Sequence, residues 1–479
     1  MKGWAYADYA PPMPRLKVDM SRWPVILANN NFRAIINGGL TLGSLVLDGH
    51  DQRASNWKEM AFESIGLFNA LLKDDGSYDE AVNYLNYAMT YQLHAMEAAR
   101  RMSGIDFFDS ANFQGMMDYV LAMYLPDDLY GHGSLTFGDA GNTLRSSKAF
   151  WVARNARDGL AQYIALNYSD HDLLSLLYYD ASVQPTPPEE NAHFVELDLD
   201  WIISRNGYEP DDFVVGMRSG APMNHEHGDR NSIQMKAFRE ILLADHRRLT
   251  YFAMDPEWEM RGTGGHNAVL IDGVGHQYHE GEEGTNESKS YARIVRSGER
   301  DGYHFWASDA TSAYKLVHKD VRSVTRTVIS FPDVPAVVVL DKIIKQSQPS
   351  IFASRWHAEN ADGQAAIKFS DQSFVIARPQ ARLHATVASN VPQSVAVGEF
   401  VSANKDHPYK FVEVESSQQA LQSLSVMVAI AVRSGEPDPT IEIVQGSGEW
   451  TIDMQRNDKS TLLRISDSGE LPEFEVLRK

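Results

Sequence analysis

The sequence predicts a multidomain α+β protein in which a helical (α/α) toroid, complete or incomplete, precedes an antiparallel β-sandwich. Three observations predict this order. Apolar residues recur at three and four positions from about Arg33 to Tyr179, a spacing typical of amphipathic helices. A proline-rich segment at 184–190 interrupts that pattern. Short alternating or β-branched runs follow it, as expected for strands.

The helical pattern divides into separate segments that contain almost no proline. An Asp-Asp-Gly-Ser turn at 74–77 separates two of them. Antiparallel helix pairs joined by short loops fit either a bundle or a toroid. We therefore predict a helical domain over 1–184, with helices near 33–48, 54–73, 79–101, 108–124 and 147–167.

The segment QPTPPEE at 184–190 is predicted to be a domain boundary, because consecutive prolines remove backbone donors and disfavour helix. Beyond it, Gly, Asp and Asn separate short apolar runs, a spacing typical of antiparallel sheets. We predict a β-sandwich domain over 192–385 and a β-rich C-terminal portion over 386–479. The clearest strand candidates are 213–215, 268–271, 324–331, 336–340, 374–377 and 425–432.

Composition narrows the classes of function. The 479-residue chain is 43% hydrophobic, enough for more than one core, and its formal net charge of −20 argues against a nucleic-acid partner. No apolar run approaches the roughly 18 residues of a membrane helix, so no membrane span is predicted. The chain has no Cys, which leaves His and carboxylate side chains as metal ligands. Its opening, MKGWAYADYAPPMPRL, fits neither a leader nor a helix cap, and we expect that preceding sequence is missing or was removed.

The strongest local signal for chemistry is the segment His225-Glu226-His227-Gly228-Asp229. Alternate residues of an extended chain point the same way, so two imidazoles and a carboxylate could share one site. The alternative is a solvated, histidine-rich turn. Farther along, Asp245 ends an apolar run and His266 precedes the strand candidate at 268–271, where a β scaffold could present ligands.

A second group of candidate residues lies in the helical half, after DGSYDE at 75–80. Tyr84, Tyr87, Tyr91 and His94 follow at offsets of three, four and three, which places all four on one face of a helix. An aromatic stripe of this kind is usually core. Because each of these side chains ends in a titratable or hydrogen-bonding group, the alternative is that they form the solvated wall of a concave binding site.

The order of these elements resembles the β domain of the heparinase II/III family of polysaccharide lyases. The similar elements are the HxHxD segment at 225–229, the strand ending in Asp245, and HNAVLIDG at 266–273; RTVISF at 326–331 and VVVLD at 337–341 are also similar. The resemblance implies that Zn²⁺, in a structural role, binds His227, Asp245 and His266. It also implies that Asp229 orients the site and that His225 faces the substrate as a catalytic residue.

The helical half is similar to the same family in two places. DGSYDEAVNY at 75–84 resembles the family's DGxxxEGxxY helix, which implies Tyr84 as the catalytic tyrosine, with Tyr87 next. Glu80 takes the acidic position, and we predict that Glu80 and Tyr91 bind substrate.

INGGL at 36–40 resembles a family turn whose polar residue neutralises the substrate carboxylate, a catalytic role that falls to Asn37. Gly38 takes the place of a His that some relatives have. The alternative for Asn37 is a helix cap or turn residue. LTFGDAGN at 135–142 is similar to a family loop, without an assignable role for Asp139.

The acidic chain also has a basic cluster around the histidine segment. Arg230 and Arg247, which we predict to bind substrate, belong to it together with Lys236, Arg239 and Arg248. A polyanion could contact these side chains. The alternative is that they are ordinary surface charges.

The resemblance implies a lyase that cleaves a uronate-containing anionic polysaccharide by β-elimination. The C5 proton is removed, the C4–O bond breaks, and the product carries an unsaturated uronyl group. One alternative is a zinc-dependent hydrolase of a carbohydrate with Glu226 as the base, and another is a non-catalytic polysaccharide-binding protein on the same fold. The family also implies a periplasmic or secreted location, and a homodimer is one assembly that the sequence allows. The sequence leaves the particular uronate polymer open.

Overall fold

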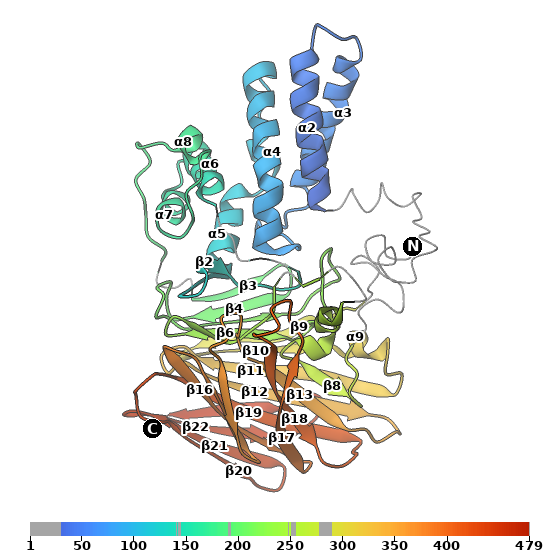
Figure 1. Ribbon diagram of the computed structural model, residues 1–479, viewed down its shortest axis with the longest axis vertical. Coiled ribbons are helices and arrows are strands. Elements are labelled where there is room, and N and C mark those ends of the chain that lie inside the picture. The colour runs from blue at the N-terminus through green and yellow to red at the C-terminus, as the bar shows by residue number, and fades with distance from the viewer. Residues whose placement is uncertain are drawn as a thin grey trace.

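The computed structural model describes residues 30–139, 141, 145–189, 193–247, 249–250, 255–276 and 290–478. Helices come first along the chain and stand on layers of antiparallel sheet (Figure 1). This arrangement confirms the predicted mixture of helices and antiparallel sheets. The closed toroid stays a prediction.

Helices occupy most of the first half of the described chain, and α2, α3 and α4 stand side by side (Figure 1). Gly38 allows α2 and α4 to approach closely, since a Cβ on Gly38 would lie 2.9 Å from Cβ of Tyr91. The helices are α2 (Asn31–Leu47), α3 (Ala54–Asn69), α4 (Ala81–Ser103), the short η2 (Phe108–Ser110), α5 (Phe113–Met123), α6 (Ser146–Ala156), α7 (Gly159–Asn167) and α8 (Ser175–Tyr178).

Two predicted helices differ from the observed ones: one is divided into two helices, and the other begins later than predicted. The single helix predicted over 147–167 is wrong, because Arg157 adopts a left-handed φ of 57° and the chain turns there. The side chain of Asp158 then caps α7 by accepting a hydrogen bond from Ala161 N. The helix predicted over 108–124 begins only at Phe113, where Asn112 is the cap.

An antiparallel hairpin also lies in the half predicted to be all helical. It consists of β1 (Tyr124–Asp127) and β2 (Gly131–Ser134). The fully buried Arg205, from the β half, donates hydrogen bonds to the carbonyl oxygens of Ala122 and Tyr124. The hairpin is therefore fastened directly to the sheets.

The described residues of the β half form four antiparallel sheets, which contain all six predicted strands. In spatial order, the five-stranded sheet is β3 (Phe194–Leu197), β4 (Trp201–Arg205), β5 (Val214–Arg218), β6 (Ile233–Ala237) and β7 (Glu240–Leu243). The eight-stranded sheet is β14 (Ala366–Phe369), β15 (Ser373–Ala377), β16 (Ala381–Ser389), β19 (Gln422–Arg433), β12 (Ala336–Lys345), β11 (Val321–Phe331), β10 (Tyr303–Asp309) and β9 (Arg293–Arg300). A four-stranded sheet is β17 (Gln393–Phe400), β18 (Tyr409–Ser416), β13 (Phe352–His357) and β8 (Val269–Ile271), and another is β20 (Thr440–Gln445), β21 (Glu449–Arg456), β22 (Lys459–Ser466) and β23 (Glu473–Arg478). Short helices η3 (Pro256–Arg261), η4 (Thr263–Gly265) and α9 (Thr311–Lys315) lie in the connections.

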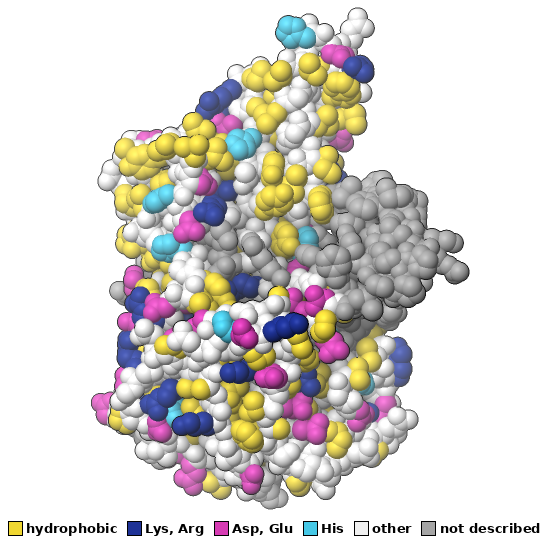
Figure 2. Space-filling view, viewed as in Figure 1, with side chains coloured by type: hydrophobic (Ala, Val, Ile, Leu, Met, Phe, Trp, Pro, Cys, Tyr) yellow, Lys and Arg dark blue, Asp and Glu magenta, His cyan; other side chains and the backbone are white. Residues whose placement is uncertain are grey.

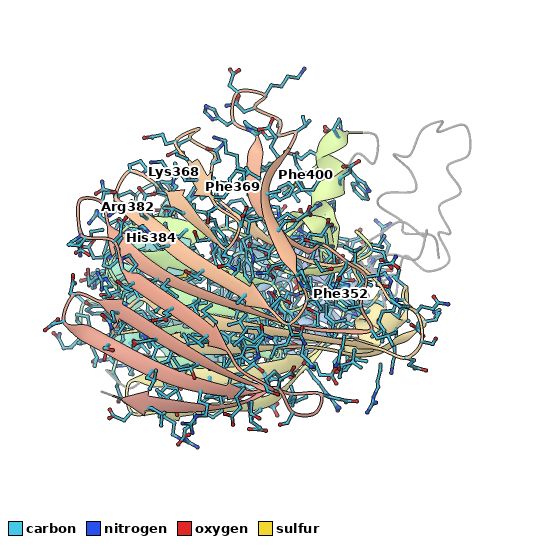
Figure 3. The ribbon with its side chains drawn as sticks, turned by 90° about the horizontal axis from the view of Figure 1, so that it is seen from below. Phe352, Lys368, Phe369, Arg382, His384 and Phe400 are labelled. Atoms are coloured by element: carbon cyan, nitrogen blue, oxygen red, sulfur yellow. The ribbon has the colours of Figure 1, made fainter. Side chains whose placement is uncertain are left out.

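The eight-stranded sheet is the middle layer, which explains why β12 and β19 read as nearly continuous apolar runs. One of its faces shares a core with the five-stranded sheet and with β13 and β18, and the other packs on β21 and β22. Seen from below, Lys368 and Phe369 of β14 lie near Arg382 and His384 of β16, and Phe352 lies on the opposite side (Figure 3).

The predicted boundary between residues 385 and 386 needs correction. It falls inside β16, and β19 pairs with both β16 and β12. Residues 386–433 therefore contribute to the same layers as the preceding β domain, because the sequence signal for a strand does not tell which sheet the strand joins. Only β20–β23 form a separate outer sheet.

Hydrophobic side chains gather on the visible surface of the helices, whereas charged side chains are spread over the β half (Figure 2). Leu173, Leu176 and Leu177 near α8 are among the most exposed apolar residues. Within the described part of the chain, none of the helices combines the length and hydropathy needed to cross a bilayer.

Candidate active site at the junction of the two halves

The loop between β5 and β6 carries the predicted histidine segment to the junction of helices and sheets. His225 has a left-handed φ of 58°, which is uncommon for a residue other than Gly. Its side chain is partly exposed, whereas His227 is fully buried. The two imidazoles therefore lie in different surroundings, with His225 against α4 and His227 inside the β half.

His227, Asp245 and His266 converge in the β half, and one ligand atom from each lies within 4.8 Å of the other two. All three side chains are buried. Both ring nitrogens of His227, Oδ1 of Asp245 and Nε2 of His266 have no hydrogen-bond partner among the described residues. Buried polar atoms are normally satisfied, so this donor set fits a metal ion. Two imidazoles and a carboxylate are ligands that Zn²⁺ accepts.

Burial keeps His227 in the form that can bind a metal. It lowers the pKa of the His227 imidazole to about 3, and the charge of Arg261 acts in the same direction. A ligating imidazole must be neutral, so His227 has the required protonation state at neutral pH. His266 Nδ1 lies 3.2 Å from Asp245 Oδ2, which leaves His266 Nε2 facing the cluster.

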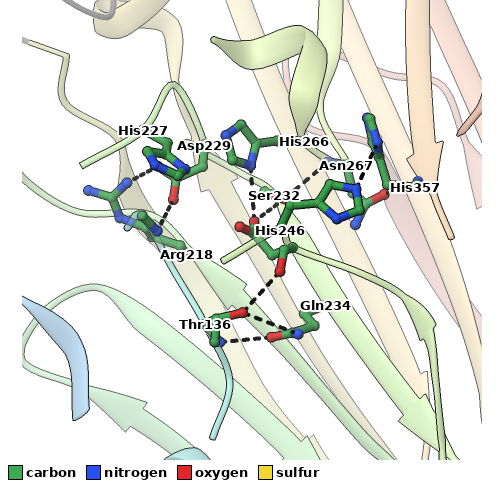
Figure 4. Close-up of polar contacts among 12 residues, drawn as sticks. Thr136, Arg218, His227, Asp229, Ser232, Gln234, His246, His266, Asn267 and His357 are labelled. Atoms are coloured by element: carbon green, nitrogen blue, oxygen red, sulfur yellow. Dashed lines mark hydrogen bonds and ion pairs between the residues drawn. The ribbon is translucent and has the colours of Figure 1, made fainter. Parts of the chain in front are cut away.

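Neighbouring polar side chains hold this cluster in place (Figure 4). The amide Nδ2 of Asn267 donates to the carbonyl oxygens of Ile233 at 2.7 Å and Ala244 at 2.8 Å. Ser232 Oγ donates to Asp245 Oδ2 at 3.2 Å. These bonds connect the ends of β6 and β7 to the segment that precedes β8, so three strands position the ligands jointly.

A loop from the helical half also reaches the cluster. Asp139 Oδ1 lies 3.5 Å from Nε2 of His227 and 3.1 Å from Nη1 of Arg261, and Asp139 N donates to His225 O at 2.8 Å. Burial alone would raise the pKa of the Asp139 carboxyl, but Arg261 and His227 outweigh it and the net pKa is lowered. Asp139, which had no role assignable from the sequence, is therefore an ionised neighbour of His227.

Two buried arginines enclose Glu226 and Asp229. Arg230 Nη2 lies 2.7 Å from Glu226 Oε2, and Arg218 pairs with both carboxylates. The second oxygen of Asp229 accepts a hydrogen bond from Gly138 N at 2.9 Å. Asp229 thus anchors the loop from the helical half. Glu226 is a poor candidate for a general base, because its carboxylate is buried and already paired.

The partly exposed side of the junction is formed by Tyr84 of α4 and His225. Their rings are stacked, with centroids 3.8 Å apart and planes 7° apart. Behind them, the buried Glu80 places Oε1 3.2 Å from Nδ1 of His225. A phenol and an imidazole held side by side are suited to acid–base chemistry on neighbouring atoms of a ligand.

The model of the family described as heparinase II/III-like, C-terminal matches residues 187–444, which is more than half of the chain. The chain belongs to the heparinase II/III family. This confirms the family resemblance found in the sequence. No curated protein sequence matches this heparinase II/III-like chain significantly.

Solved structures share the heparinase-like fold at low sequence identity. A crystal structure of heparinase III aligns with a TM-score of 0.68 at 12% identity, covering 92% of this chain and 68% of that chain. The heparan sulfate lyase HepC from Pedobacter heparinus aligns with a TM-score of 0.66 at 14% identity, covering 93% of this chain and 66% of that one. The chain thus spans about two thirds of the length of these structures.

Other predicted site residues of this heparinase II/III-like chain lie away from the Tyr84–His225 pair. Tyr87 is 47% exposed and forms an edge-to-face contact with Tyr91, with centroids 5.5 Å apart. The hydrogen bond with Tyr91 raises the pKa of Tyr87, which disfavours it as a base. Asn37 is buried, and its Nδ2 donates to Ala61 O of α3 at 3.0 Å. The predicted role of Asn37 in neutralising a substrate carboxylate is therefore corrected to a link between two helices.

Three of the predicted substrate contacts are also corrected. Glu80 and Arg230 are buried among hydrogen-bonding partners and lack a surface for a polysaccharide. The guanidinium of Arg247 lies 3.2 Å from the ring centroid of Tyr130, and its side chain is only 14% exposed. Lys236 is buried as well, and Arg248 lies outside the described residues. The clustering of basic residues in the sequence does not tell whether each charge is exposed at the surface or buried in an ion pair.

The sequence did not identify the residues that support this site. Asn31 lies at the start of α2, and its backbone N–H donates to Glu80 Oε2 at 2.8 Å. Arg218 and Arg261 are fully buried beside carboxylates. The only signal for Asn31 was a run of three Asn before an apolar segment, which is typical of a helix cap. Because the partners are distant in sequence, their contacts could not be predicted.

Proposed function

We propose that this chain is a polysaccharide lyase that cleaves a uronate-containing anionic polysaccharide by β-elimination. The observation that carries the proposal is the stack of Tyr84 on His225 at the junction of the two halves. Family membership and the shared fold support it. The structural relatives are a heparinase III and a heparan sulfate lyase, so a glycosaminoglycan is the first substrate to test.

The proposed reaction divides the proton transfers between the two stacked rings. His225 Nε2 takes the proton from C5, next to the uronate carboxyl group. The electron pair of the C5–H bond forms the C4–C5 double bond, and the C4–O bond breaks with its pair on the leaving oxygen. The hydroxyl of Tyr84 donates a proton to that oxygen. C4 and C5 are bonded to each other, so an acid and a base must stand close together, as these rings do.

We further propose that His227, Asp245 and His266 hold a structural Zn²⁺. The supporting observation is the set of buried, unpartnered ligand atoms that converge within 4.8 Å. When bound, the ion would cross-link the loop after β5 to the ends of β7 and η4. His227 lies two residues beyond His225, so fixing His227 also restricts the backbone that presents the base.

Two alternatives predict different products. A zinc-dependent hydrolase would need Glu226 or another base near the metal, and Glu226 is paired with Arg218 and Arg230. A protein that only binds polysaccharide would give no product, and Tyr84→Phe would not alter its affinity. A periplasmic or secreted location and a homodimer remain predictions.

The deciding experiment incubates the zinc-loaded protein with heparan sulfate, heparin, chondroitin sulfate, hyaluronan and alginate in parallel. We expect ultraviolet absorbance from the new C4–C5 double bond with at least one polymer. Mass spectrometry would identify products that lack the added water of hydrolysis. Tyr84→Phe is the matched control, since the ring stack stays and the hydroxyl is lost. Absence of the unsaturated product with every polymer, from a folded sample, would refute the lyase proposal.

A further inference from the structure

Glu80 is a buried carboxylate that is surrounded by hydrogen-bond donors. It lies at the start of α4 and is 1% exposed. Asn31 donates from its backbone N–H to Oε2 at 2.8 Å and from its side chain to both oxygens. Tyr78 donates to Oε2 through its hydroxyl, and Asn224 donates to Oε1 through its amide. These contacts join three segments of the chain, two helical and one from the β half.

The charge state of Glu80 follows from these contacts. Burial alone would raise the pKa of its carboxyl, but the hydrogen bonds from His225, Tyr78 and Asn224 outweigh burial, and the net pKa is lowered. Glu80 is therefore ionised at neutral pH and can only accept hydrogen bonds.

This anion determines how the imidazole of His225 is held. Nδ1 of His225 lies 3.2 Å from Oε1 of Glu80. A ring N–H facing a carboxylate gains a charge-assisted hydrogen bond, whereas a ring lone pair in that position is repelled. Asn224 Nδ2 lies 2.8 Å from the same ring nitrogen and donates to the same carboxylate oxygen. Its second N–H competes with the carboxylate for Nδ1, and the charged carboxylate is the stronger partner. Stacking on Tyr84 fixes the plane of the ring, and Glu80 fixes its rotation within that plane.

We propose that Glu80 is a positioning residue that holds His225 in its Nδ1–H tautomer and leaves Nε2 unprotonated toward the substrate. The inference rests on the proposed role of His225 as the base. It gives Glu80 a task different from the substrate contact expected from the sequence. It also means that the base is supplied by the β half but is oriented by the helical half.

The test combines a spectroscopic signature with kinetics. Nitrogen-15 NMR of the ring nitrogens, assigned by comparison with His225→Ala, reports directly which nitrogen of neutral His225 carries the proton. We expect Nδ1 to be protonated in the wild type. A proton found on Nε2 instead would overturn the proposal, and this measurement on the wild type needs neither substrate nor turnover. It therefore separates failure of the positioning role from failure of the lyase proposal.

Glu80→Gln provides the kinetic arm, because it removes the charge and turns an amide N–H toward neighbouring donors. We expect kcat to fall about 10- to 100-fold, with KM changed less than about threefold and the Nε2–H tautomer newly populated. Glu80→Asp, which retains the charge, should recover part of kcat. The matched control is Glu97→Gln on the same helix, where a buried carboxylate pairs with Arg154 at 2.6 Å. A folded Glu80→Gln with wild-type kcat and tautomer would overturn the proposal.

Discussion

The two sides of the junction differ in how much water reaches them. On the helical side, Tyr84 is partly exposed and Tyr87 is 47% exposed. On the β side, His227, Asp245 and His266 are each at most 1% exposed. Groups that must meet a large substrate need access, whereas buried polar groups need fixed partners. We therefore expect changes on the helical side to act on turnover and changes on the β side to act on stability.

Removing the hydroxyl of Tyr84 should have the largest effect on turnover. Tyr84→Phe retains the ring that stacks on His225, so the melting temperature should stay nearly unchanged. A lost general acid typically costs about 10²- to 10⁴-fold in rate, and we expect kcat for the unsaturated product to fall by that amount. Tyr179→Phe, at the C-terminal end of α8, is the control and should retain most activity. Equal losses in both variants would contradict the assignment.

Removing a ligand on the β side should act first on metal content and stability. We expect His266→Ala to lower bound zinc from about one ion per chain to nearly none, measured by elemental analysis. The melting temperature should fall by several degrees, and a chelator added to the wild type should reproduce the fall. His94→Ala, a histidine of α4, should change neither quantity. Full zinc content in His266→Ala would remove this residue from the ligand set.

The contact between α2 and α4 is where we expect a small substitution on the helical side to change the free energy of unfolding. A Cβ on Gly38 would lie 2.9 Å from Cβ and 3.0 Å from O of Tyr91, whereas a Cβ on the adjacent Gly39 would meet nothing within 4 Å. Gly38→Ala should lower the free energy of unfolding by about 1–3 kcal/mol. Gly39→Ala should raise it by about 0.5–1 kcal/mol through helix propensity. Chemical denaturation of the pair would measure both, and similar values would argue against the close approach.

The smallest expected effect concerns the pH dependence of the β side. Burial lowers the pKa of the Lys236 amine to about 7, while its Nζ donates to the carbonyl oxygens of Glu209 and Asp212. Between about pH 7 and the usual lysine pKa near 10.4, the unfolded chain holds a proton here that the folded chain has released. The free energy of unfolding should therefore rise with pH in that window. Lys236→Met should reduce the rise by an amount on the order of 1 kcal/mol, measured by urea denaturation at pH 7 and pH 9. An unchanged slope would contradict the shifted pKa.

Local patterns predicted the strands and most helices, because alternation and helical spacing are properties of adjacent residues. These patterns did not select His227, Asp245 and His266 as a set, which came from the family resemblance, and the structure brings the three side chains together. Their proposed role as zinc ligands stays a prediction. The hairpin at β1 and β2 was missed because its Gly-rich second strand has no clear alternation.

The environment of each charge could not be predicted from the sequence. Arg230 and Lys236 look like surface charges in the sequence, yet both are fully buried. Asn37 has the residue type expected of a substrate contact, but its amide bonds to Ala61 of a neighbouring helix. Burial and partner choice depend on contacts between residues far apart in the chain, for which a single sequence carries no signal.

The pairing of Asp139 with the histidine loop and of Glu80 with His225 has a consequence for how the molecule is made. A ribosome releases the chain from its N-terminal end, so the helical half emerges well before residue 225 has been synthesised. Until then, Glu80 and Asp139 have no imidazole to hold. Each newly made molecule must therefore finish its second half and dock it before Tyr84 can stack on His225, so assembly itself delays the completion of the junction.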